Sequence, residues 1–304
     1  MTRGIKHGLV ATLVGLALLW GCQQKKDTIR IATKPMTEQF ILGEMLSLLI
    51  EENSDLQVKI TKGVGGGTSN IHPALVKGDF DLYPEYTGTG WLVILKKDTL
   101  LPADELHAAL REVYSREYGL KWLSPYGFNN AYSLAVSNDL AKKYNLKTFS
   151  DLALHPDQFT FGAEYDFYEI NDGYADLCAY YNFKFKKNLD MDIGLKYEAM
   201  KSGKIDVINI FTTDGQLSKA HLTVLEDDKH FFPSYYCATV VREETLREHP
   251  ELEGILEKMK GILTDSDMAD MNYQVDIEHR PEREVAAEFL KKKGLLNQQL
   301  SYGK

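Results

Sequence analysis

Hydrophobic and polar positions in the first third of the chain alternate between strand and helix patterns. Residues 28–32 alternate apolar and polar side chains as a half-buried strand does, and residues 37–52 carry apolar side chains at helical spacing. The same patterns predict a strand over 56–60, a helix over 69–77 and a strand over 80–83. Short connections between such elements are typical of a mostly parallel α/β sheet, whose ligands bind at the carboxyl ends of the strands.

A second round of the same pattern begins near residue 130. It predicts strands over 131–136, 160–163, 205–211, 222–225 and 234–241, helices over 140–144 and 173–181, and a helical tail over 250–260, 265–274 and 282–293. We therefore expect two α/β lobes with the second inserted in the first. Lobe 1 comprises residues 28–129 and 232–304, lobe 2 comprises 130–231, and the chain crosses near 127–130 and 230–233.

The N-terminus has the pattern of a secretory signal. Arg3 and Lys6 precede a short apolar run over 9–20, which is followed by Gly21 and Cys22. Leu-Trp-Gly-Cys resembles a bacterial lipoprotein cleavage box, so we expect residues 1–21 to be removed, Cys22 to be lipidated and residues 22–27 to form a tether. The alternatives are an uncleaved anchor or an ordinary signal with a chance cysteine. The mature protein is expected in the cell envelope, anchored to a membrane and facing the periplasm or the exterior.

Charge and motifs exclude several functions. The net charge is -9, and loss of Arg3 and Lys6 with the signal leaves -11, which argues against a nucleic-acid partner. Cys178 and Cys237 are predicted to be small buried side chains, and the scattered histidines predict no metal site. The glycine turn over 63–68 lacks the Gly-Lys-Ser/Thr ending of a phosphate loop, and no motif indicates a cofactor or a catalytic nucleophile.

The segment 81–91, DLYPEYTGTGW, is the strongest candidate for a binding site. It places tyrosines and a Thr/Gly turn at the predicted end of a strand. Aromatic rings beside hydroxyl groups suit a ligand that is cationic and partly apolar. The alternative is that these tyrosines pack against the edge of a core.

Six blocks in collinear order resemble the substrate-binding proteins of quaternary-amine osmoprotectant ABC importers, a family of glycine betaine, choline and carnitine binders that also includes ergothioneine binders. The resemblance covers nearly the whole mature chain. The blocks are KPMTEQFILGEML (34–46), LVKGDFDLYPEYTGTGW (75–91), YGFNNAYSLAV (126–136), NDGYADL (171–177), IDVINIFTTDGQL (205–217) and FFPSYYCATVV (231–241).

The resemblance implies a two-lobed, periplasmic-binding-protein-like fold of type II, with a ligand cleft between lobes that close as a hinge. It also implies an aromatic cage, because a trimethylammonium group has no N–H to donate and is held by ring faces. The motifs assign the cage to Tyr86, Tyr132, Phe211 and Tyr235, and Phe211 stands where a tyrosine is expected. Along a strand, Tyr235 and Tyr236 would face opposite sides, and the motif favours Tyr235.

The polar end of the ligand is less well defined by the resemblance. In glycine betaine binders of this type a lysine, a hydroxyl and an arginine hold the carboxylate; Lys34 and Thr89 match the first two, whereas Ile170 stands at the arginine position. This departure weakens the case for glycine betaine, and choline needs less positive charge. Asn130 is a candidate polar partner, and Glu38 is interpreted as a complement to the helix N-terminus.

The sequence therefore predicts a lipid-anchored, non-enzymatic protein that captures a choline- or glycine betaine-class compound and delivers it to an ABC permease. One alternative is the same fold with another small zwitterion such as ergothioneine. Others are a membrane-anchored hydrolase or transferase, and a sensor domain.

Overall fold

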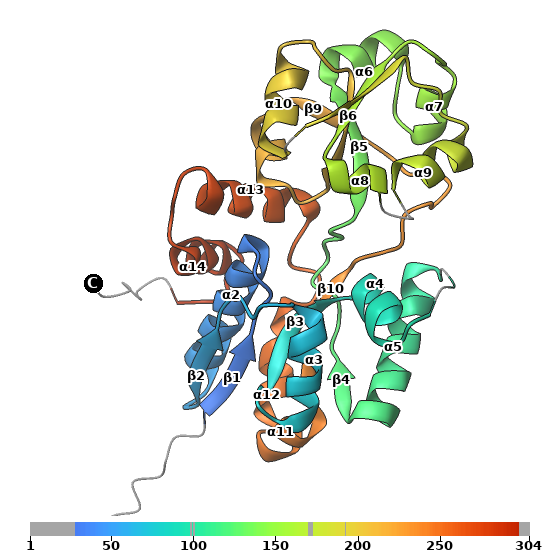
Figure 1. Cartoon of the computed structure of the whole chain (residues 1–304). Coiled ribbons are helices and arrows are strands. Elements are labelled where there is room, and N and C mark those ends of the chain that lie inside the picture. The colour runs from blue at the N-terminus through green and yellow to red at the C-terminus, as the bar shows by residue number, and fades with distance from the viewer. Residues whose placement is uncertain (1–27, 98, 100, 170–172, 192, 298–304) are drawn as a thin grey trace, which may run out of the picture.

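The computed structural model describes residues 28–97, 99, 101–169, 173–191 and 193–297, which form two α/β lobes, each built on a five-stranded sheet (Figure 1). The predicted signal, Cys22 and Ile170 lie outside the described residues. We use lobe 1 for the elements β1 to β4 and β10 to α14, and lobe 2 for β5 to β9 with the helices between them.

The sheet of lobe 1 has the strand order β2-β1-β3-β10-β4. Strand β1 pairs in parallel with β2 and β3, whereas β10 is antiparallel to both of its neighbours. The strands are β1 (Thr28–Ala32), β2 (Gln57–Thr61), β3 (Leu82–Tyr86), β4 (Leu120–Trp122) and β10 (Cys237–Arg242). The helices are α2 (Thr37–Asn53), α3 (Thr68–Lys77), α4 (Thr87–Thr89), the π-helical η1 (Gly90–Ile94), α5 (Ala103–Tyr118), α11 (Glu243–Glu248), α12 (Glu251–Leu256), the 3₁₀ turn η3 (Glu257–Met259), α13 (Asp265–Asp276) and α14 (Glu282–Lys292).

The sheet of lobe 2 has the order β7-β6-β8-β5-β9, in which β5 is antiparallel to β8 and β9 and the other pairs are parallel. Its strands are β5 (Tyr132–Ser137), β6 (Thr160–Ala163), β7 (Lys187–Asp190), β8 (Val207–Phe211) and β9 (Leu222–Leu225). Its helices are α6 (Asn138–Tyr144), α7 (Phe149–Ala153), α8 (Tyr165–Glu169), α9 (Tyr174–Tyr181), α10 (Ile193–Lys201) and the 3₁₀ turn η2 (Gly215–Lys219).

The prediction of mostly parallel sheets is wrong in one respect. In each lobe the strand that follows a crossing, β5 or β10, runs against its two neighbours. These strands enter from the other lobe, at the end of the sheet where the parallel strands finish. Each crossing therefore delivers a new strand beside the carboxyl ends where ligands of such sheets bind.

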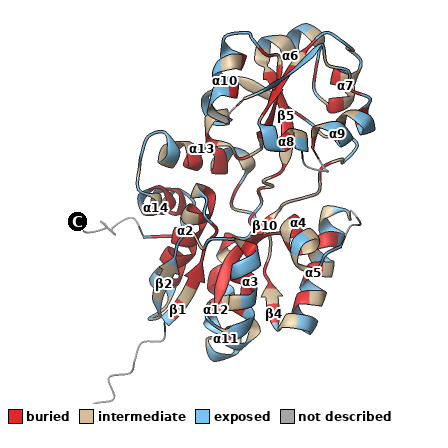
Figure 2. Cartoon of the chain, viewed as in Figure 1, coloured by how far each residue is buried: buried red, intermediate tan, exposed pale blue. Residues whose placement is uncertain are grey.

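Helix α2 is the central helix of lobe 1. It is buried along most of its length, and the C-terminal helices α12, α13 and α14 pack against it (Figure 2). In the first turn of α2, Glu38 and Gln39 are buried, which matters because Glu38 carries a charge there. In lobe 2 a separate core of phenylalanines and tyrosines fills the space under α7 and α9.

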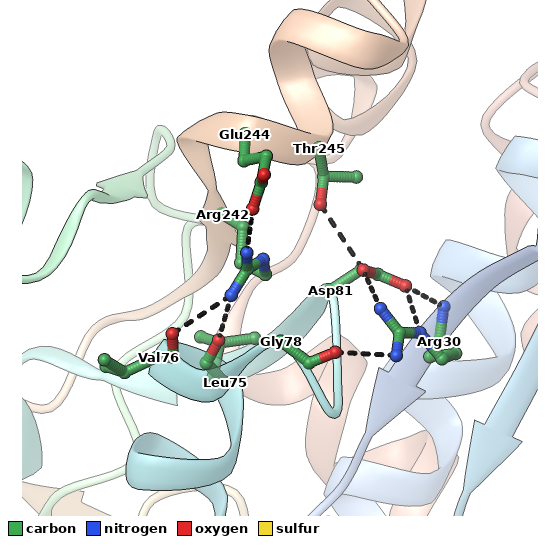
Figure 3. Close-up of polar contacts among 8 residues, drawn as sticks. All are labelled: Arg30, Leu75, Val76, Gly78, Asp81, Arg242, Glu244 and Thr245. Carbon is green, nitrogen blue, oxygen red and sulfur yellow. Dashed lines mark hydrogen bonds and ion pairs between the residues drawn. The ribbon is translucent and has the colours of Figure 1, made fainter.

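Asp81 anchors the start of β3 far from the end where the candidate site lies. Its carboxylate accepts hydrogen bonds from the backbone N–H of Arg30 at 2.7 Å and from the Arg30 guanidinium at 2.7 and 2.9 Å (Figure 3). Arg242 in turn donates to the carbonyls of Leu75 and Val76 at the end of α3. Together these bonds tie β1, α3 and β10 to β3 and fix the direction of the strand that ends at Tyr86.

Several sequence expectations are corrected. Strand β3 begins at Leu82 and ends at Tyr86, and the strand predicted over 234–241 begins only at Cys237. The expected elements do not include helix α5, whose apolar side chains lie four residues apart, or β4, β7, α7, α8, α10 and α11. Cys178 and Cys237 are free thiols, of which Cys237 is buried and Cys178 half-buried. Within the described residues, no helix is long and apolar enough to cross a membrane, and no cluster of potential metal ligands occurs.

Candidate ligand-binding site

The two crossing segments meet the strand ends that carry the predicted cage residues. In the sheet registers, Tyr132 at the start of β5 pairs with Phe211 at the end of β8, and Cys237 at the start of β10 pairs with Tyr86 at the end of β3. The crossings also bind each other, because the backbone N–H of Tyr235 donates to the side-chain oxygen of Asn129 at 2.6 Å. The topology therefore gathers residues that are far apart in the sequence.

Lobe 2 contributes a group of aromatic rings around Tyr132. The ring of Tyr132 lies 4.5 Å from that of Phe211, 5.2 Å from that of Phe167 and 5.8 Å from that of Phe232, measured between centroids. Tyr132 and Phe211 are half-buried, whereas Phe167 and Phe232 are buried. Two predicted cage residues thus lie together, supported from behind by two phenylalanines that were not predicted.

Lobe 1 contributes Tyr235, which lies against the α4 turn. A Cβ atom on Gly88 would fall 2.6 Å from the Tyr235 ring, so only glycine permits this approach. Tyr235 and Tyr236 precede β10, Tyr236 as a β-bridge partner of Asn129, and both are half-buried; that they face opposite sides stays a prediction. Thr89, the predicted hydroxyl contact, is half-buried at the end of the same turn.

Tyr86 is almost completely buried at the end of β3. Its hydroxyl donates a 2.5 Å hydrogen bond to Glu38, and the ammonium group of Lys34 lies 4.6 Å from its ring centre. Lys34 forms a buried ion pair with Glu85, whose other oxygen accepts a 2.6 Å hydrogen bond from Thr68. In this structure the charge of Lys34 is therefore balanced within lobe 1, and its contact with a ligand carboxylate stays a prediction.

Glu38 is a pocket residue that the sequence interpretation did not assign to the site. It lies in the first turn of α2, as a complement to the helix N-terminus would, but it is 98% buried and its carboxylate accepts from Tyr86, Asn130 and Asn272. Burial raises the pKa of Glu38, and hydrogen bonds from Tyr86, Thr213, Asn130 and Asn272 oppose that rise. A buried carboxylate at the junction of the lobes is costly unless it is compensated by donors or by a cation.

A pocket of about 360 Å³ opens at Glu38 between the lobes. Two of the predicted residues, Asn130 and Phe211, line it. The other predicted residues are not among its lining residues: Lys34, Tyr86, Thr89, Tyr132 and Tyr235. Its described lining contains three carboxylates and neither lysine nor arginine: Met36, Thr37, Glu38, Asn130, Phe211, Thr213, Asp214, Gly215, Asn272 and Asp276. Larger hollows of about 800 and 1010 Å³ lie elsewhere and contain no predicted site residue.

Two α/β lobes joined by crossing segments, with a pocket and aromatic side chains at the junction, define a two-lobed solute-binding protein of the periplasmic-binding-protein class. Residues 27–292 match the family described as the substrate binding domain of ABC-type glycine betaine transport system. The chain belongs to this family.

The relatives of this chain are named for different ligands. The chain is 47% identical over 265 residues to the ergothioneine transport permease/ergothioneine binding protein EgtU of Helicobacter pylori, a match that covers 87% of this chain and 47% of the relative. It thus spans about half the length of that relative. It is 36% identical over 269 residues to the carnitine transport binding protein OpuCC of Listeria monocytogenes, covering 88% of this chain and 87% of the relative.

A solved structure confirms the architecture. The crystal structure of a glycine betaine/carnitine/choline ABC transporter has a TM-score of 0.84 with this chain at 33% identity, and the match covers 88% of this chain and 100% of the other. The predicted fold and family are therefore confirmed.

Proposed function

We propose that this protein captures a small quaternary ammonium compound in the pocket beside Glu38 and delivers it to the permease of an ABC importer. The lobes close over the ligand as a hinge about the two crossing segments. The protein itself performs no chemistry, and its place is the outer side of a membrane, to which Cys22 anchors it.

The observation that carries the proposal is a pocket that Phe211 of lobe 2 and the buried carboxylate of Glu38 of lobe 1 line together. A quaternary ammonium group cannot donate a conventional hydrogen bond, so ring faces and a nearby negative charge are the groups that stabilise it. Phe211 lines the pocket and the Tyr132 ring packs on the Phe211 ring, while in lobe 1 Tyr86 bonds Glu38 and Tyr235 lies against Gly88. Glu38 gives the pocket the charge that a cation complements.

The charge of the pocket lining favours some quaternary amines over others. A ligand with a free carboxylate, such as glycine betaine, would bring a fourth negative group to Glu38, Asp214 and Asp276, with neither lysine nor arginine in the described lining. Choline carries a hydroxyl in that place. Ergothioneine, named for the Helicobacter relative, carries azole N–H groups besides its carboxylate. The charge of the lining therefore favours choline over glycine betaine and ergothioneine, which both carry a carboxylate, and ergothioneine is a candidate because a relative is named for it.

Isothermal titration of the mature chain with choline, ergothioneine, carnitine and glycine betaine tests the proposal. We expect at least one of them to bind in the micromolar range or tighter, to saturate at one site, and to raise the melting temperature of the protein. An absence of binding by all four, with the protein shown to be folded, would contradict the proposal.

A further inference from the structure

Two asparagine side chains in the pocket have acceptor atoms without a partner. The side-chain oxygens of Asn130 and Asn272 are both buried, and neither has a hydrogen-bond partner among the described residues. Both residues line the pocket beside Glu38, and Asn272 is only 6% exposed. A buried acceptor left unsatisfied is unfavourable, so these atoms indicate a partner that comes from outside the protein.

The orientation of both amides is fixed by groups that can only accept. The Nδ2 of Asn130 donates to Glu38 at 3.1 Å, and the Nδ2 of Asn272 donates to the carbonyl of Thr213 at 2.8 Å and to Glu38 at 3.5 Å. Turning either amide over would place its oxygen against a carboxylate or a carbonyl oxygen. The oxygens of Asn130 and Asn272 therefore point away from Glu38, because the carboxylate accepts from their N–H groups.

The carboxylate of Glu38 has little capacity left to accept hydrogen bonds from a ligand. One of its oxygens accepts from Tyr86 and Asn130, and the other is the acceptor for Asn272. Glu38 thus orients the two amides while the oxygens of Asn130 and Asn272 remain without a partner among the described residues. Asn272 comes from α13 of lobe 1 but bonds Thr213 of lobe 2, so the pair of acceptors spans the junction.

We propose that Asn130 and Asn272 determine the specificity of the site by accepting hydrogen bonds from N–H or O–H groups in the part of the ligand outside its quaternary ammonium group. Glu38 acts as a positioning residue that holds both acceptors in place. The ligand class is then a quaternary ammonium compound with a donor-bearing tail, such as a hydroxyl or an azole. A tail that only accepts, such as an ether or an ester, leaves both oxygens unsatisfied. This inference rests on the proposed function.

A matched ligand pair tests the inference on the native protein. Choline and its O-methyl ether share the trimethylammonium group and differ in the hydroxyl donor, and tetramethylammonium reports on the cage alone. We expect choline to bind about tenfold or more tightly than the ether, because the ether leaves buried acceptors unpaired. Equal affinity for the two would overturn the inference. If none of the three ligands nor ergothioneine binds, the proposed function itself has failed.

Two variants separate recognition from structural support. In Asn272→Leu, affinity for choline and ergothioneine is expected to fall about tenfold or more, while affinity for tetramethylammonium stays within about twofold. In Glu38→Gln, the new amide cannot accept from both asparagines, so one of them turns its N–H group to the pocket and the preference for choline over its ether shrinks. An equal loss for all ligands in Asn272→Leu, together with an unchanged preference in Glu38→Gln, would assign both residues a structural role and overturn the proposal.

Discussion

The ammonium group of Lys34 and the carboxylate of Glu85 form a buried ion pair on one face of the Tyr86 ring. Glu85 is fully buried, and Thr68 and the backbone N–H of Tyr86 complete its hydrogen bonds. Lys34 therefore supports the end of β3 and the ring that bonds Glu38. The sequence suggests that Lys34 binds a ligand carboxylate. In this structure Lys34 pairs with the buried carboxylate of Glu85.

Substitution of Lys34 by methionine is expected to destabilise the protein strongly. Removing one partner of a buried pair leaves an uncompensated charge and typically costs about 3–5 kcal/mol. Urea unfolding measures the loss, and the matched control is Lys34→Met combined with Glu85→Gln, which removes both charges and should recover much of the stability. A single variant as stable as the native protein would show that the ion pair contributes nothing to stability.

Substitution of Gly88 by alanine is expected to weaken ligand binding with little loss of stability. The added Cβ would lie 2.6 Å from the Tyr235 ring, so the ring must move from its present position. Gly65→Ala is the matched control, because its Cβ would meet no atom within 4 Å. Calorimetric titration should show weaker binding for Gly88→Ala alone. If both variants bind like the native protein, Tyr235 is not a wall of the site.

The elements of the fold were predictable where the pattern is local. The alternation over 28–32 and the helical spacing in 37–52 led to β1 and α2, which the structure confirms. The pattern for α5 is equally clear, since Leu106, Leu110 and Tyr114 recur every four residues, although the expected elements do not include this helix. The antiparallel direction of β5 and β10 was not visible, because strand pairing between distant segments leaves no local signal.

The site was predictable only in part, for the same reason. The motifs nominate the aromatic residues, and the structure brings Tyr132 and Phe211 together. The partners of Glu38 are separated from it by 48, 92 and 234 residues, so no local pattern distinguishes it from an ordinary acid in a first helical turn. Asn272 lies in a helix whose relation to lobe 2 follows only from the tertiary fold.

Substitution of Tyr132 by leucine tests the aromatic wall in lobe 2. A desolvated cation over an aromatic ring is stabilised by up to about 2 kcal/mol, so affinity should fall by as much as about 30-fold. Tyr144→Leu is the control, because Tyr144 also belongs to lobe 2 but packs against His155 and Phe159. Equal affinities for the two variants would place Tyr132 outside the site.

Ligand binding is expected to depend on pH through Glu38. Burial raises the pKa of Glu38 in the ligand-free protein, and a bound cation favours the ionised carboxylate and lowers that pKa. Binding therefore releases a proton near the raised pKa, and affinity should be constant above it and fall as the pH drops through it. The stability of the ligand-free protein depends on pH in the opposite direction to the affinity. Because the pKa of this carboxyl is raised in the folded state, the free energy of unfolding falls as the pH rises through the folded-state pKa.

Titrations between about pH 4.5 and pH 8 in buffers of different ionisation enthalpy measure both the affinity and the proton release. In Glu38→Gln the dependence attributed to this group should disappear. A native affinity that is independent of pH, or a dependence that persists unchanged in Glu38→Gln, would show that the bound cation does not interact with Glu38.

The most direct test of the account compares a quaternary ammonium ligand with its uncharged tert-butyl analogue. The two have nearly the same shape and apolar surface, and they differ in the positive charge that aromatic rings and Glu38 are proposed to hold. In calorimetric titration of the native protein, choline should bind and its tert-butyl analogue should bind at least about tenfold more weakly. Equal binding of the two would contradict the claim that this protein recognises a quaternary ammonium cation.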